Sequence, residues 1–226
     1  QYAPNITAAF DRYPALKAAV TAPDGHIYTL PSMIQLGEGS GIGAVRFFHA
    51  INQTWLDNLG LAMPTTLEEL HDVLLAFKTQ DPNGNGQADE IPFSFMFGWW
   101  CADIGDLFGA FGMPDTIADY EHVIVRDGKV IYTAVQPEYR DAIAYFHSWV
   151  EEGLIDSESF TQDVQTYLAK GKAGDVSQLG SYIWWEIEEV VGPDRADQYT
   201  LVPPLAGPTG VTGVGHANGS GIGRAA

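Results

Sequence analysis

The chain has 226 residues, with 11 Lys and Arg against 29 Asp and Glu, giving a formal net charge of −18. This length allows one large domain or two small ones, and a hydrophobic content of 46% is enough to build a core. The acidic balance excludes nucleic acid and a polybasic membrane surface as partners, and no run approaches the roughly 18 apolar residues of a membrane span.

Helices and strands alternate along the first sixty residues. Residues 14–20 are predicted to form a short helix, and the turn signal Pro23-Asp24-Gly25 precedes a predicted strand at 26–30. An apolar run at 45–51 predicts a buried strand. Residues 52–59 then predict a helix that Gly60 ends in a left-handed conformation.

Two longer helices have clear boundary signals. Thr66-Leu67-Glu68-Glu69 is a capping box, and apolar residues follow it at helical spacing. The second helix is predicted from Pro137 to Gly153, with Pro in its first turn and Gly after its end. Its apolar residues fall on one face: Ala142, Tyr145, Phe146, Trp149 and Val150.

The elements between and after these helices complete a mixed α/β order. Residues 122–132 predict a hairpin around Asp127-Gly128. Helices are predicted at 163–170 and 182–191, and a strand at 199–202 before two prolines. The sequence therefore predicts the α/β class.

The segment from Asp81 to Pro92 predicts a calcium site. Calcium prefers six to eight oxygen ligands, and this segment begins with the first six positions of an EF-hand loop, D-x-[DN]-x-[DN]-G. Gly86 supplies the bend, and the carbonyl of residue 87 falls at a position that ligates in such loops. The predicted ligands are Asp81, Asn83, Asn85, Gln87, Asp89 and Glu90.

The match to the EF-hand pattern does not extend to its last position. An EF-hand needs Glu at position 12, where this chain has Pro92, and a helix does not easily continue through Ile91-Pro92. We therefore expect a structural calcium loop rather than an EF-hand switch. The alternative is an Asn/Gly-rich turn that binds no metal.

Two pairs of tryptophans indicate a ligand site. Trp99-Trp100 follows a predicted strand, and Trp184-Trp185 follows Tyr182 at a predicted helix start. Indole rings stack on sugars, and α/β proteins bind ligands at strand ends and helix N-termini. The alternative is that all four tryptophans belong to the core.

Two other functions compete with ligand binding. Acidic residues suited to glycoside hydrolysis occur in two segments: Asp103 or Asp106, with Glu186, Glu188 and Glu189. Because acidic residues of an acidic protein usually face water, we expect no catalytic residues and no enzyme activity. A calcium-dependent structural or adhesion module is the third hypothesis.

Three short sequence segments occur together with the calcium loop, at residues 22–31, 51–60 and 63–69. In combination they resemble the extracellular solute-binding proteins of carbohydrate-type ABC importers (family 1). The resemblance is greatest to the lipoprotein-type and alginate-oligosaccharide-binding branch. It implies a periplasmic-binding-protein-like type II lobe, with a mixed sheet flanked by helices and hinge segments at both ends.

The resemblance also implies an organisation. Residues 1–43 would lie near the hinge, residues 44–202 would form the second lobe with the calcium loop at 81–90, and residues 203–226 would return toward a missing first lobe. It places calcium at the ligands named above. It places sugar stacking at Trp184 or Trp185, with Trp99 or Trp100 and Tyr182 behind them. Polar candidates near the hinge or cleft strands are Glu38, Arg46 and His216.

The implied partners are an oligosaccharide and the membrane permease of an ABC transporter. The protein would act as a monomer, without nucleic acid. It would be extracellular or periplasmic and held at the membrane by a lipidated N-terminus that this chain does not include.

Overall fold

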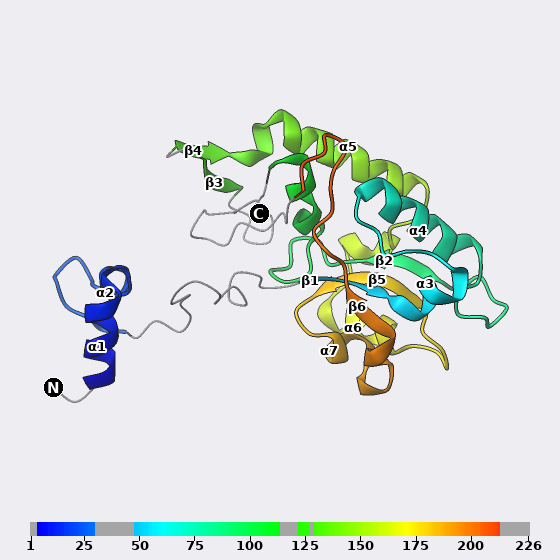
Figure 1. The fold of residues 1–226 in the computed structure, drawn as a ribbon, viewed down its shortest axis with the longest axis horizontal. Helices are drawn as coiled ribbons and strands as arrows, with labels where there is room; N and C mark the ends of the chain where they lie inside the picture. The colour runs from blue at the N-terminus through cyan, green and yellow to red at the C-terminus, as the bar shows by residue number, and fades with distance from the viewer. Residues whose placement is uncertain (1–3, 30–47, 114–121, 127–128, 213–226) are drawn as a thin grey trace. The chain divides into compact units, whose positions relative to one another are not determined.

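The computed structural model describes residues 4–29, 48–113, 122–126 and 129–212 (Figure 1). Contacts divide the chain into two units, residues 1–46 and residues 47–226, which are treated separately. None of the helices in the described part of the chain has the length and apolar character needed to cross a membrane.

The first unit contains two short helices, α1 (Pro4–Arg12) and α2 (Pro14–Val20). The second confirms the predicted helix at 14–20. The strand predicted at 26–30 is wrong for its described residues, because only an isolated bridge joins Thr21 to Ile27. The Asp24 carboxylate accepts hydrogen bonds from the Tyr28 hydroxyl at 2.6 Å and the His26 N–H at 2.9 Å. These local bonds hold a turn rather than an extended strand.

The second unit is built on a mixed sheet of four strands among its described residues, in the order β2-β5-β1-β6. These strands are β1 (Phe48–Asn52), β2 (Ile91–Ser94), β5 (Leu179–Trp184) and β6 (Tyr199–Leu201). β2 runs parallel to β5, whereas β1 is antiparallel to both β5 and β6. β1 confirms the strand predicted at 45–51 over its described residues, and β6 confirms the strand predicted at 199–202 as far as Leu201.

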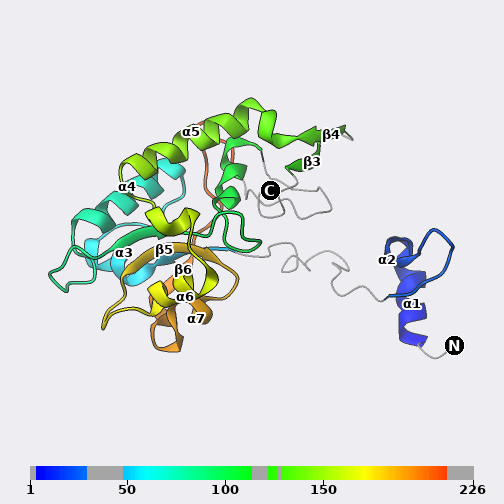
Figure 2. The same cartoon turned by 180° about the vertical axis from the view of Figure 1, so that it is seen from behind.

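Helices cover both sides of this sheet. α4 (Leu67–Thr79) and α5 (Pro137–Glu151) lie on one side, and α6 (Val164–Lys172) and α7 (Ile187–Val191) on the other (Figures 1 and 2). The short α3 (Gln53–Leu59) follows β1 directly. Short 3-10 turns lie between these elements: η2 (Ile104–Phe111), η4 (Thr133–Val135), η5 (Ser157–Phe160) and η6 (Pro193–Gln198).

The helix boundaries follow from local chemistry. The Thr66 hydroxyl accepts from the Glu69 N–H at 3.0 Å, as the capping box predicts. The Glu69 carboxylate reaches back one residue further than expected, to the Thr65 N–H at 2.7 Å. Gly60 ends α3 with φ 67°, which confirms its predicted role. The hairpin of β3 (Val123–Arg126) and β4 (Lys129–Tyr132) and the helix at 163–170 are also confirmed.

The helix predicted at 182–191 is wrong over its first half. Residues 179–184 form β5, and α7 begins only at Ile187. All six residues of β5 are buried, because neighbouring strands flank it and helices cover both faces. Such a strand lacks the alternation of apolar and polar residues by which strands are recognised. Gly180 is required there, since a Cβ would lie 2.6 Å from the Phe77 ring and 2.9 Å from the Pro92 carbonyl oxygen.

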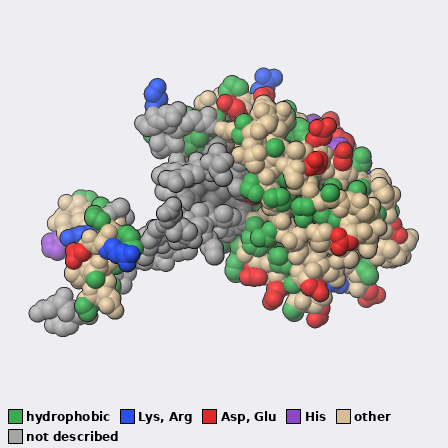
Figure 3. Space-filling view, in the orientation of Figure 1, with side chains coloured by type: hydrophobic (Ala, Val, Ile, Leu, Met, Phe, Trp, Pro, Cys, Tyr) green, Lys and Arg blue, Asp and Glu red, His purple; other side chains and the backbone are tan. Residues whose placement is uncertain are grey.

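Among the described Asp and Glu side chains, only Asp103 and Asp106 are buried. Figure 3 shows Asp and Glu side chains spread over the second unit and few Lys or Arg. The core beneath is aromatic: Trp55, Trp149, Tyr167, Tyr182, Phe77, Phe93, Phe95 and Phe108 are among its fully buried side chains.

Candidate functional site

The candidate residues gather at opposite ends of the two parallel strands β2 and β5. Residues 81–90, the oxygen-rich loop, precede β2, and Gln178 precedes β5. Trp99 and Trp100 follow β2, whereas Trp184 ends β5 and Trp185 follows it. We refer to Phe97, Trp99, Trp100 and Trp185 as the aromatic end.

The oxygen-rich loop curls as its sequence predicts. The Asp81 carboxylate accepts from the Asn85 N–H at 3.1 Å and from the Gly86 N–H at 3.0 Å. The Asn83 side-chain oxygen accepts from the Asn85 N–H at 3.0 Å. Asp81 itself has φ 47° and Gly86 has φ 74°, values that tighten the turn. Side chains at alternate positions therefore converge on the inside of the loop.

The Asp89 carboxylate accepts hydrogen bonds from side-chain amides of this loop and of Gln178. Its carboxylate accepts from the Asn85 side-chain N–H at 3.1 Å, from Asn83 at 3.4 Å and from Gln178. Burial acts to raise the pKa of Asp89, but the hydrogen bonds from Gln178, Asn85 and Asn83 outweigh it and lower that pKa. Asp89 is therefore held as a carboxylate. A half-turn of either Asn amide exchanges its nitrogen for its oxygen, so the same side chains can present oxygen to a cation.

Glu90 is the residue of this loop whose hydrogen bonding is incomplete. Its Oε1 is buried and has no hydrogen-bond partner. Burial and the negative charges of Asp89 and Asp81 raise its pKa. An orphaned oxygen beside two carboxylates fits a hard cation, which would satisfy the oxygen and offset the repulsion. The described residues contain no group of three His, Cys, Asp or Glu suited to a metal, so amide and main-chain oxygens would have to complete the shell.

The loop is tied to its surroundings by main-chain carbonyls. Asn58 of α3 donates to the Pro82 oxygen at 2.9 Å, and Asn83 donates to the Ser177 oxygen at 3.2 Å. The Ile91 N–H donates to the Gln178 oxygen at 2.7 Å. The loop thus joins α3 to the start of both parallel strands.

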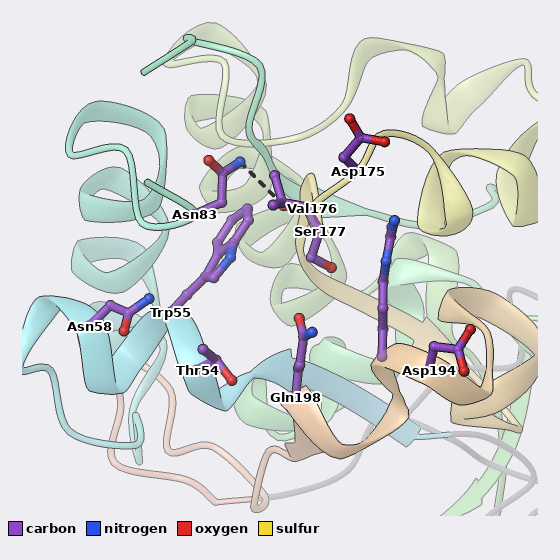
Figure 4. A pocket seen from close by; sticks show the side chains of 10 residues that line it. Thr54, Trp55, Asn58, Asn83, Asp175, Val176, Ser177, Asp194 and Gln198 are labelled. Carbon is purple, nitrogen blue, oxygen red and sulfur yellow. Dashed lines mark hydrogen bonds between the residues drawn. The ribbon is translucent and has the colours of Figure 1, made fainter. Parts of the chain in front are cut away.

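A pocket of about 450 Å³ lies beside this loop (Figure 4). The Trp55 indole, Asn83 and Ser177 line it together with residues of the segment 194–198, in which Arg195 donates to the Ala173 oxygen at 2.8 Å. The pocket lies at the oxygen-rich end and contains none of the predicted sugar-binding residues. Sequence reasoning missed it because its residues come from separate segments and share no local pattern.

The aromatic end exposes three of the predicted tryptophans. The exposed fractions are 39% for Trp99, 44% for Trp100 and 45% for Trp185. Trp184 is only 3% exposed, packs on Tyr167 at 5.3 Å between ring centroids, and donates its indole N–H to Glu189 at 2.8 Å. Of this adjacent pair, Trp185 is therefore exposed to a ligand and Trp184 belongs to the core.

The other predicted ligand residues lie elsewhere. Tyr182 is fully buried and packs on Tyr199, at 5.4 Å between ring centroids, so the surface does not present it to a ligand. Glu38, Arg46 and His216 lie outside the described residues.

Two exposed phenylalanines at this end were missed. Phe97 and Phe160 are about half exposed, and their ring centroids lie 6.1 Å apart. The Phe97 N–H donates to the Ser159 oxygen at 2.9 Å, which fixes η5 against the loop after β2. The aromatic run 93–97 was the available signal for Phe97, whereas nothing local marks Phe160.

The carboxylates considered for catalysis are arranged for other contacts. Asp103 and Asp106 are buried, at 1% and 6% exposure, and Asp103 accepts main-chain hydrogen bonds from Gly98 and Gly105. Glu189 accepts from Trp184. A glycosidase needs two carboxyl groups that face a bound sugar from opposite sides. Asp103 and Glu189 instead bind groups of the segments that carry the aromatic rings, and Glu186 and Glu188 are exposed.

No protein-family model matches the chain. It is 43% identical over 225 residues, 99% of its length, to the fructooligosaccharide ABC transporter substrate-binding protein FusA of Streptococcus pneumoniae. It is 32% identical over 179 residues, 74% of its length, to lipoprotein LipO of Bacillus subtilis. The chain covers 40% of the first relative and 34% of the second, so it spans about two fifths or less of their length.

Solved structures agree with these relatives. FusA in complex with kestose superposes with a TM-score of 0.81 at 43% identity, over 98% of this chain and 44% of that chain. An EF-hand mutant of FusA in complex with fructo-nystose gives 0.80 at 42% identity, over 98% and 44%. An extracellular solute-binding protein from Bifidobacterium longum subsp. infantis gives 0.78 at 34% identity, over 91% and 41%. The predicted fold, a solute-binding-protein lobe with a mixed sheet flanked by helices, is confirmed.

Proposed function

We propose that this chain, a homologue of the substrate-binding proteins of sugar ABC transporters, forms one ligand-binding lobe of such a protein and captures a fructooligosaccharide. The observation that carries the proposal is the exposure of Trp99, Trp100 and Trp185 together at the carboxyl ends of β2 and β5. Ligands of α/β proteins bind at this end of parallel strands, and indole faces stack on the apolar faces of sugar rings.

The lobe would supply stacking rather than chemistry. Trp184 would support the exposed Trp185 from beneath, since it is buried and its N–H is bound to Glu189. Glu38, Arg46 and His216 remain proposed polar contacts for sugar hydroxyls. A second lobe would close over the sugar, because one lobe offers only part of a cleft. The proposed organisation keeps residues 44–202 as this lobe and residues 1–43 and 203–226 as hinge-side segments.

We propose further that the oxygen-rich loop binds a structural Ca²⁺ ion. Asp81, Asn83, Asn85, Gln87, Asp89 and Glu90 would hold it, and the orphaned Oε1 of Glu90 supports this assignment. When bound, the ion would supply positive charge beside the carboxylates of Asp81, Asp89 and Glu90 and so fix the loop against α3 and the start of β5. That FusA has been studied as an EF-hand mutant is consistent with such a site in that relative.

The proposed setting follows from the relatives. One is the binding protein of an ABC transporter and another is a lipoprotein. We propose that the intact protein lies outside the cell membrane, is anchored there by lipid, acts as a monomer and delivers its sugar to a permease. The homologues are substrate-binding proteins and not enzymes. This favours capture over glycoside hydrolysis and over an adhesion module.

A fluorescence titration tests the proposed function. Kestose and fructo-nystose are added to the intact protein, and an oligogalacturonide serves as a charged control sugar. Tryptophan emission should shift and saturate with the fructose-based sugars, because the exposed indoles would leave water. Chromatography of the mixture should show the sugars unchanged. No saturable response to any fructooligosaccharide would refute the proposed ligand, and release of fructose would restore the enzyme hypothesis.

A further inference from the structure

The loop that carries Trp99 and Trp100 is closed by one buried carboxylate. Asp103 is 1% exposed, and one of its oxygens accepts from the Gly98 N–H while the other accepts from the Gly105 N–H at 2.8 Å. Gly98 begins the loop and Gly105 lies in the first turn of η2. A single side chain thus joins both ends of the segment on which the two exposed indoles stand.

Main-chain hydrogen bonds hold the rest of the loop. The Met96 N–H donates to the Ala102 oxygen at 2.8 Å, and the Trp99 N–H donates to the Met96 oxygen at 3.2 Å. Gly98 has φ 70°, a left-handed conformation that the hydrogen bond to Asp103 fixes. Within this loop Cys101 is fully buried, whereas Trp99 and Trp100 are exposed. A preorganised pair of rings binds a sugar with less loss of conformational entropy.

A second carboxyl lies against the first. Asp106 is 6% exposed, and its Oδ1 is buried without a hydrogen-bond partner. Burial raises the pKa of Asp106 to about 7, and the charge of Asp103 adds to the shift. On α5, which packs against η2, the Tyr139 ring contacts Phe108 and the Tyr145 ring contacts Phe111. The same helix also carries Glu138, Arg140 and Asp141. Among the described residues, Asp103 is the charged group that acts on Asp106.

We propose that Asp103 is the positioning residue of the Trp99–Trp100 platform, and that Asp106 weakens this positioning when it ionises. The role of the platform in sugar binding rests on the proposed function. A second buried negative charge beside Asp103 is relieved by hydration of the pair or by release of the Gly98 N–H, and either change loosens the loop. Sugar affinity should therefore fall as the pH rises through neutrality.

The first experiment needs no sugar. Acrylamide quenching of tryptophan emission in the intact protein measures how accessible the indoles are between pH 5.5 and 8.5. Accessibility should rise with pH in the wild type and stay flat in Asp106→Asn, which keeps the shape of the side chain without its charge. The Trp99→Phe/Trp100→Phe variant should lose the pH-dependent part. Asp197→Asn, at an exposed aspartate of η6, is the control and should behave like the wild type.

The second experiment measures kestose binding by calorimetry over the same pH range. Affinity in the wild type should fall on the order of tenfold from pH 5.5 to 8.5, because the loop competent for binding requires a neutral Asp106. Asp106→Asn should bind at every pH as the wild type does at pH 5.5. Asp103→Asn keeps one acceptor oxygen for two N–H donors, so it should weaken binding roughly tenfold at every pH.

The outcomes separate this proposal from the proposed function. If kestose binds the wild type with pH-independent affinity and the quenching is also pH-independent, the role of Asp106 is overturned while the sugar-binding function stands. If no sugar binds yet quenching follows Asp106 as stated, the loop proposal stands and the sugar assignment falls. An Asp106→Asn variant that keeps the wild-type pH profile overturns the role of Asp106, and a folded Asp103→Asn with unchanged affinity overturns that of Asp103.

Discussion

The two ends of strands β2 and β5 are built on different physical principles. At the start of the strands, the oxygen-rich loop turns its polar side chains inward, where Asp81, Asn83 and Asn85 accept from main-chain N–H groups. At the other end, rings of Trp99, Trp100 and Trp185 face solvent. In the oxygen-rich loop, polar groups hydrogen-bond to one another, and the buried Oε1 of Glu90 is left without a partner. The aromatic end instead exposes apolar surface.

The difference explains why the two ends suit different ligands. A small cation needs converging oxygens at fixed distances, which a short loop can supply from adjacent positions. A sugar needs broad faces, which must come from segments that the sheet brings together. Between the two ends, all residues of β5 are buried, so the strand itself presents no surface to either ligand.

The largest expected effect is on the free energy of unfolding, and it should differ between the adjacent residues Trp184 and Trp185. Trp184→Ala should cost about 3–5 kcal/mol of unfolding free energy, because it empties a buried site beside Tyr167. Trp185→Ala should cost less than about 1 kcal/mol but weaken kestose binding roughly tenfold. Urea unfolding and calorimetry give the two quantities. Equal losses of stability in both variants would show that Trp185 is also part of the core.

Calcium removal should act on the opposite end. A ligand that binds only the folded state stabilises it by about 2.7 kcal/mol at one hundred times its Kd. Addition of a chelator should therefore lower the Tm by several degrees, as scanning calorimetry measures. Glu90→Gln, which removes the charge beside the proposed ion, is expected to reduce the dependence on calcium. A Tm that is the same with and without chelator would show that the loop is a hydrogen-bonded turn that binds no metal.

The buried carboxyl at Asp106 should make the aromatic end sensitive to pH. Because its folded-state pKa of about 7 lies above the ordinary value near 3.8, the folded state binds the proton more tightly than the unfolded state. Its contribution to stability is complete below about pH 3.8 and is lost as the pH rises to 7. Asp106→Asn should therefore be about 2–4 kcal/mol more stable than the wild type at pH 8 and show little gain at pH 4.

Urea unfolding of both proteins across this pH range measures the difference. A gain that is the same at pH 4 and pH 8 would place the effect in packing rather than in charge.

The smallest expected effect concerns the link between the loop and β5. Gln178→Ala removes the side-chain hydrogen bond to Asp89 and should cost about 1 kcal/mol. Gln165→Ala, at an exposed position of α6, should change stability by less than about 0.5 kcal/mol. Thermal unfolding of the two variants provides the comparison. If Gln178→Ala matches the control, the loop is held by its main-chain contacts alone.

Local chemistry was readable from the sequence wherever a few adjacent residues decide the outcome. Thr66 caps α4, Gly60 ends α3 and the hairpin forms at β3 and β4, because each depends on bonds within a short segment. The inward arrangement of Asp81, Asn83 and Asn85 was predictable for the same reason.

The sequence by itself therefore determined the α/β class, most helix boundaries and the oxygen-rich loop. Only the tertiary structure decided that residues 179–184 are a central strand, since burial on both faces removes the alternation that marks a strand. It also decided that Trp185 is exposed and Trp184 buried, and that Phe160 lies beside Phe97. Exposure depends on which distant segments pack against a residue, and a local pattern does not contain that information.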